Sequence, residues 1–353
     1  MYQDNEFNKE TFGEEQNFTQ NSTHTTYVTY VPYGLTPETF EERKKIKKTA
    51  LIIGGSLLVM LAITFIFSLA VSFSLVFFGI KGNDVYQWLN DLAVKQVIQI
   101  VLSSIMFTLP FIIFFKCAGY RISDLVSFKR PKKQEVLPLF LFGISFCAFA
   151  NIAVSMASSI FASMGIKYEV DFGDKPQGFF GFMLTLIATA VVPPLVEEFA
   201  CRGLILGSLR KFGDNFAIIT SSIVFGIMHG NFQQMPFAFL VGLVLAYITV
   251  KSDTLWIAVA VHSFNNFISV LVDYAFESAS QNLQNVLYAI FLIVSLILGF
   301  FALYLFKNRD DAYKLEGEKT NSTEKQKFKW FFSSATIIIF IIISVLESLA
   351  YFK

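Results

Sequence analysis

The sequence predicts an all-α protein, a polytopic membrane helical bundle of about nine transmembrane helices with a cytoplasmic N-terminus. Composition supports this class, because 54% of the 353 residues are hydrophobic and the mean hydropathy is +0.55, which excludes an ordinary soluble protein and a disordered one. The apolar residues gather in runs comparable to the ~20 residues that cross a bilayer. Lys and Arg concentrate in alternate segments between these runs, as the positive-inside rule requires.

Nine apolar runs are expected to form the helices. They lie at 49–80, 94–115, 136–164, 178–207, 215–230, 235–250, 254–272, 284–306 and 330–350. With a cytoplasmic N-terminus, the segments that face the cytoplasm hold 21 Lys and Arg residues, whereas those on the other side hold 5. This asymmetry also places the C-terminus outside.

Residues 1–42 form a polar, acidic tail rich in Asn, Thr and Gln. No apolar segment follows a basic start, so the tail is neither a signal peptide nor a folded domain, and we expect it to be disordered in the cytoplasm. The net charge is +1, and nothing indicates nucleic-acid binding. The three cysteines lie in or beside apolar runs without CxxC spacing, which indicates neither a disulfide framework nor a zinc knuckle.

Three ionisable residues, Glu197, Glu198 and Arg202, lie inside the apolar run 178–207. A charge in mid-bilayer costs several kcal/mol, so these groups need partners, water or a function. Glu198 and Arg202 are four residues apart, a spacing that suits an ion pair. Glu197 lies about 100° further round the helix and needs another partner. The preceding prolines at 193–194 are expected to bend the helix and free backbone carbonyls, unless they form only a packing kink.

Two further apolar runs carry His229, His262 and Asn266. At 1.5 Å rise per residue, each lies about 14–24 Å from the nearest cytoplasmic turn, as Glu197 does, so three helices bring polar groups to a similar depth. His262 and Asn266 share a helix face and could both donate to one oxyanion. The alternatives are a buried structural histidine and a helix–helix hydrogen bond from the asparagine. Phe225, on the face of His229, is expected to pack and orient that ring.

Three motifs, taken in order, resemble those of the CPBP family, also called Abi, which comprises CAAX prenyl proteases and bacteriocin-processing or immunity proteins. They are EExxxR at 197–202, FxxxH at 225–229 and HxxxN at 262–266. The resemblance covers about residues 136–275. It divides the rest of the chain into the tail, N-terminal helices with a basic loop at 43–135, and C-terminal helices at 276–353.

The resemblance implies an intramembrane endopeptidase that hydrolyses a peptide bond in a membrane-associated peptide or protein. Glu197 with His229 would activate water, and His262 with Asn266 would stabilise the oxyanion. The resemblance also implies a supporting role for two flanking residues, Glu198 and Arg202. The alternative is a non-catalytic membrane scaffold, or a bacteriocin self-immunity protein, that modulates a membrane partner. Proton-coupled transport would also use buried Glu and His, but the sequence has no internal repeat.

We expect no cofactor, because a His–Asn pair suits oxyanion donors better than metal ligands. The alternative is a zinc ion held by Glu197, His229 and His262. The expected partners are the lipid bilayer and a peptide or membrane-protein substrate. Abundant Phe, Ile, Lys and Asn resemble low-GC bacterial proteins, which favours a multi-pass protein of the bacterial plasma membrane.

Overall fold

The structure is a computed structural model that describes residues 34–77, 91–165, 178–275, 280–307 and 320–351, with the single positions 32, 168 and 315. The first helix, α1 (Pro37–Phe77), begins within the predicted tail 1–42. Residues 37–42 are therefore helical, because Pro37 occupies the first turn and the Thr36 hydroxyl accepts a hydrogen bond from the Thr39 N–H. The part of the tail before residue 32 lies outside the described residues.

Five further long helices follow the predicted runs closely. They are α3 (Leu92–Cys117), α5 (Lys133–Ser163), α10 (Met235–Ser252), α11 (Trp256–Ala275) and α12 (Gln281–Lys307). The run 178–207 is helical throughout but changes its hydrogen-bond pattern along its length. Its elements are α6 (Gly178–Leu186), π-helical η1 (Ile187–Val191), α7 (Val192–Glu198), π-helical η2 (Phe199–Ile205), α8 (Leu206–Leu209) and the 3₁₀ turn η3 (Arg210–Phe212).

The predicted helical bundle is confirmed, with a smaller number of long helices than nine. Within the described residues, seven helices are long and apolar enough to cross a membrane. The run 215–230 forms α9 (Asp214–Ile227), which has only 14 residues. The run 330–350 forms α13 (Glu324–Phe332) and α14 (Ala335–Leu349), which are bent by 72° and would make an eighth span together. The remaining element is the short α4 (Ile122–Leu125).

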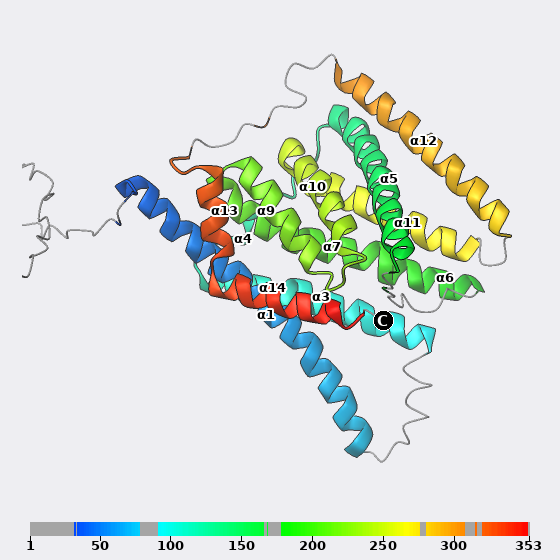
Figure 1. Cartoon of the computed structure of the whole chain (residues 1–353), viewed down its shortest axis with the longest axis horizontal. Coiled ribbons are helices and arrows are strands. Elements are labelled where there is room, and N and C mark those ends of the chain that lie inside the picture. The colour runs from blue at the N-terminus through cyan, green and yellow to red at the C-terminus, as the bar shows by residue number, and fades with distance from the viewer. Residues whose placement is uncertain are drawn as a thin grey trace, which may run out of the picture.

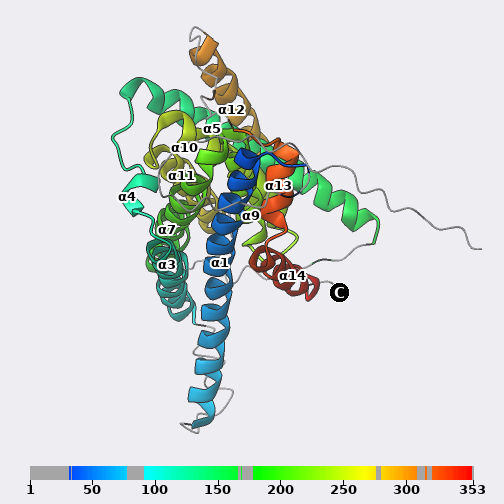
Figure 2. The ribbon, with the colours of Figure 1, turned by 90° about the vertical axis from the view of Figure 1, so that its left-hand side faces the viewer.

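Two hydrophobic cores hold the helices together. One joins α1 to η2, α9 and the C-terminal pair, and it includes the fully buried Leu204 and Phe216. The other joins α5, α10 and α11 through residues such as Leu245 and Val261. α12 packs on α5 at one edge of the bundle, away from α1 and α14 (Figure 1). The C-terminal half of α1 projects beyond the other helices (Figure 2).

Described parts of the segments predicted to face the cytoplasm lie together at one end of the bundle, which we call the basic end. There Lys211 Nζ donates a 2.9 Å hydrogen bond to the Tyr120 hydroxyl. Lys129, from the loop before α5, forms an ion pair with Asp253, which follows α10. Segments far apart in sequence therefore share one side of the bundle, as the distribution of Lys and Arg requires.

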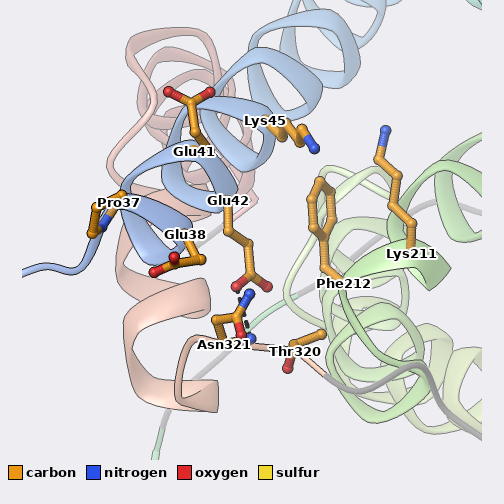
Figure 3. Close-up of a pocket in the computed structure, with 9 residues that line it drawn as sticks. All are labelled: Pro37, Glu38, Glu41, Glu42, Lys45, Lys211, Phe212, Thr320 and Asn321. Carbon is orange, nitrogen blue, oxygen red and sulfur yellow. Dashed lines mark hydrogen bonds between the residues drawn. The ribbon is translucent and has the colours of Figure 1, made fainter. Parts of the chain in front are cut away.

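A pocket of about 550 Å³ opens at the basic end, between the start of α1, η3 and the segment before α13 (Figure 3). Its lining carries both acidic and basic side chains, including Glu38 and Lys45. Glu42 closes its floor, because Glu42 Oε2 accepts hydrogen bonds from the backbone N–H groups of Asn321 and Ser322 at 3.2 and 3.0 Å. The C-terminal segment is thus fastened to the first helix, at a place separate from the polar residues of the core.

Candidate functional site

The broken helix that runs from α7 into η2 contacts α3 on one side and α11 on the other. Glu198 ends α7 and is fully buried, and Arg202 lies one turn further on with 2% exposure. Arg202 Nη1 lies 2.9 Å from Glu198 Oε1. The predicted ion pair is therefore present, and it neutralises a carboxylate that could not otherwise be buried so deeply.

Glu198 also holds His262. Nδ1 of His262, on α11, lies 2.9 Å from the same Glu198 Oε1. Because a carboxylate only accepts hydrogen bonds, Nδ1 carries a proton and Nε2 faces the other way. Nε2 of His262 lies 4.0 Å from Oε2 of Glu197. The sequence left Glu197 without a partner, and this imidazole lies nearest to it.

Glu197 differs from Glu198 in its access to solvent. The Glu197 side chain is 14% exposed, whereas the Glu198 side chain is 0% exposed. The buried carboxylate is already engaged by Arg202 and His262. Of the two adjacent carboxylates, only Glu197 can therefore reach water or a substrate, while Glu198 contacts His262 and Arg202 in the interior.

The ring of Phe225, on α9, joins the remaining groups. Its centroid lies 4.1 Å from the guanidinium of Arg202, a cation–π geometry. The rings of His229 and His262 pack edge-on against it at 5.0 and 6.0 Å. We expected Phe225 to orient one histidine, and the structure shows that it contacts both and the arginine as well.

His229 follows the end of α9, and its Nδ1 lies 2.8 Å from the Phe225 carbonyl oxygen. Since that carbonyl can only accept, Nδ1 carries a proton, and in the neutral ring Nε2 carries a lone pair. Among the described residues, the hydrogen bond of His229 goes to Phe225 and not to Glu197. Glu197 and His229, the two residues implied to activate water, are linked through His262, which lies 4.0 Å from Glu197 and packs, like His229, against the Phe225 ring.

Asn266 lies one turn after His262 on α11. Its Nδ2 donates a 3.0 Å hydrogen bond to the carbonyl of Thr189 in η1. Its Oδ1 accepts a 3.2 Å hydrogen bond from Asn265 Nδ2. Sequence reasoning missed both partners, Thr189 and Asn265. The proline pair at 193–194 was the signal for Thr189, because it predicted that backbone carbonyls nearby would be freed.

The polar groups do not form a ready metal site. Among the described residues, no three His, Cys, Asp or Glu side chains are placed to hold a metal ion together. Nδ1 of His262 is engaged by Glu198, and Nδ1 of His229 by the Phe225 carbonyl, an arrangement that histidines with a metal ion on Nε2 also show. The donor set Glu197, His229 and His262 is not gathered around one point among the described residues, and the reaction below is derived from protein groups.

Comparison with known proteins identifies the segment that carries this cluster. Residues 179–268 match the family model of the type II CAAX prenyl endopeptidase Rce1-like proteins. This Rce1-like segment contains all three motifs, so the resemblance stated from them is confirmed. The chain is also 27% identical over 115 residues to the "Putative membrane peptidase YdiL" of Bacillus subtilis (strain 168).

The similarity is partial on both sides. The aligned region covers 31% of this chain and 47% of the Bacillus protein, so the chain matches about half the length of that relative. No solved structure matches the chain. The chain is thus a multi-pass membrane protein whose central segment is similar to a family of membrane peptidases, and the helices outside 179–268 lie beyond the family match.

Proposed function

We propose that this protein is an intramembrane endopeptidase of the Rce1-like type. One observation carries the proposal: the partly exposed carboxylate of Glu197 faces an imidazole, His262, that is fixed from behind by the buried Glu198 and Arg202 pair. A carboxylate and histidines that meet within the membrane are costly to bury, and such residues usually serve a function. The family match at 179–268 supports the same class of reaction.

In the proposed reaction Glu197 removes one proton from water, while the Nε2 lone pair of His229 accepts a hydrogen bond from the second O–H, which stays on the oxygen, and so orients the water. The water oxygen attacks the carbonyl carbon of the scissile peptide bond. The resulting oxyanion accepts hydrogen bonds from a protonated His262 Nε2 and from the second N–H of Asn266. The C–N bond then breaks, the amine takes the proton held by Glu197, and the products are a carboxylic acid and an amine.

The proposed substrate is a peptide or a membrane-protein segment that reaches the site from within or beside the bilayer. The proposed location is a bacterial plasma membrane, with the basic end in the cytoplasm. The proposed reaction uses side chains of this protein alone, without a second protein or a cofactor. Glu198, Arg202 and Phe225 position these groups without touching the substrate.

The test compares cells that express the wild-type chain with cells that express Glu197→Gln, by quantitative proteomics of membranes and medium. We expect one or more peptides to lose their cleaved form with Glu197→Gln, while the variant inserts at the wild-type level. Glu41→Gln, at an exposed ion pair of the basic end, is the matched control and should leave cleavage unchanged. Equal product from Glu197→Gln and wild type would overturn the proposal and favour a membrane scaffold or immunity protein.

A further inference from the structure

Two neighbouring backbone carbonyls of η1 accept hydrogen bonds from side-chain amides of two other helices. Gln99 Nε2, on α3, lies 3.0 Å from the Ala188 carbonyl oxygen. Asn266 Nδ2, on α11, lies 3.0 Å from the Thr189 carbonyl oxygen. α3 and α11 thus both contact η1, which directly precedes α7 in the broken helix.

These two carbonyls lack a backbone donor because of the two prolines that follow. In η1 the backbone bonds connect residues five apart, as the Val192 N–H bonds to the Ile187 carbonyl. The next two donors in that register would be the N–H groups of residues 193 and 194, toward residues 188 and 189. Both positions are proline, which has no N–H.

Those two carbonyls would be expensive to leave unpaired. Ala188 is fully buried, and a backbone carbonyl without a partner inside a membrane protein costs several kcal/mol. Gln99 and Asn266 each supply one amide N–H in place of the missing proline donor. The correspondence is one to one, since two donors are missing and two side-chain amides are present.

We propose that Gln99 is a positioning residue that replaces the N–H missing at Pro193 and so fixes the turn that carries Glu197. Gln99 lies outside the Rce1-like segment, and Glu197 follows Pro193 by four residues, about one helical turn. Asn266 does the same for Pro194 with one of its two amide hydrogens. Only the catalytic consequence rests on the proposed function; the structural role does not.

The structural role is tested with Cys201, which is fully buried in η2 one turn after Glu197. In a Cys117→Ser, Cys147→Ala background, the rate of labelling by a membrane-permeant maleimide reports opening of the broken helix. Gln99→Met keeps the side-chain length but cannot donate. It should speed labelling about two- to ten-fold, the effect of one lost hydrogen bond. Gln96→Met, one turn earlier on α3, is the control and should leave the rate unchanged.

Restoring the backbone donor gives the decisive comparison. Adding Pro193→Ala to Gln99→Met returns an N–H to the broken helix, so labelling should fall back toward the wild-type rate. If Gln99→Met alone does not yield folded protein, Pro193→Ala should recover it. Unchanged labelling of Gln99→Met, the same increase in Gln96→Met, or no recovery by Pro193→Ala would each overturn the proposal.

The same variants separate this proposal from the proposed function. If the chain is a peptidase, the product measured by proteomics should fall with Gln99→Met and recover with Pro193→Ala. If the chain is not a peptidase, the labelling result stands without any change in product. A loss of product without faster labelling would place Gln99 in substrate contact and overturn the positioning role.

Discussion

Glu198 fixes the imidazole of His262 through a 2.9 Å hydrogen bond at Nδ1. The same carboxylate oxygen receives Arg202 at 2.9 Å, so one buried atom holds a cation and an imidazole together. The other oxygen, Oε2, is buried without a hydrogen-bond partner among the described residues, as is Arg202 Nη2. This triad orients Nε2 of His262 toward Glu197, and its integrity is the first condition for the proposed chemistry.

Removing one member of the buried pair should destabilise the protein more than removing both. Glu198→Leu or Arg202→Met leaves an uncompensated charge and should lower the free energy of unfolding by about 3–5 kcal/mol, whereas the double variant should lose clearly less. Thermal unfolding in detergent measures the four proteins. Glu41→Ala, in an ion pair whose side chains are about half exposed, should change stability by about 1 kcal/mol or less. Additive losses in the double variant would contradict the pairing.

The ring of Phe225 should matter for both histidines. Phe225→Leu keeps the backbone carbonyl that holds His229 but removes the face over Arg202 and the edges against His229 and His262. We expect product formation to fall about ten-fold or more. The free energy of unfolding should fall by up to about 2 kcal/mol, because the cation–π contact is lost. The control is Phe264→Leu on α11, a partly exposed ring that packs on Phe140. Equal effects of the two variants would argue against a role for Phe225 in the site.

Asn266 has two proposed roles that a paired substitution separates. Asn266→Ala removes both the donor to the Thr189 carbonyl and the donor to the oxyanion. Adding Pro194→Ala returns a backbone N–H for Thr189 but cannot restore the oxyanion donor. We expect the double variant to recover thermal stability while product formation stays about 10²–10³-fold low. Full recovery of product would mean that Asn266 only positions the broken helix.

Gly230 directly follows His229 and has φ +63, a left-handed conformation. A Cβ at this position would also lie 3.0 Å from Oε2 of Glu347 on α14. Gly230→Ala should therefore cost about 1–2 kcal/mol of stability from the backbone alone and reduce product formation by displacing His229. In a Glu347→Ala background the contact between the new Cβ and Glu347 is removed, whereas the cost of the left-handed backbone remains. A neutral effect of Gly230→Ala on product would show that the position of His229 does not limit the reaction.

Chelation is expected to leave product formation unchanged. The proposed reaction uses protein groups alone, and Glu197, His229 and His262 are not gathered around one point among the described residues. Membranes treated with 1,10-phenanthroline should therefore cleave at the rate of untreated membranes, while a zinc peptidase added to the same membranes loses activity. Loss of cleavage that zinc restores would replace the proposed reaction by a metal-dependent one.

Most of the helical architecture could be predicted from the sequence. Apolar runs of membrane length locate the long helices, because backbone groups in lipid must be paired within the segment. The distribution of Lys and Arg grouped the loops that meet at the basic end. The run 215–230 is the exception, since hydropathy does not tell a short buried helix such as α9 from a full span. Composition also did not predict that α1 begins at Pro37, because a local capping hydrogen bond sets this helix start.

The sequence by itself determined that the apolar runs carry these polar groups and that Glu198 pairs with Arg202, since spacing along one helix sets that pair. Only the tertiary structure decided that His262 turns Nδ1 to Glu198 and that Phe225 joins three charged or polar neighbours. It also decided that Gln99 and Asn266 pair with the carbonyls beside the prolines. These partners come from other helices, 64 residues apart for His262 and Glu198, and the direction of a ring or an amide depends on which donor or acceptor the packing places opposite it.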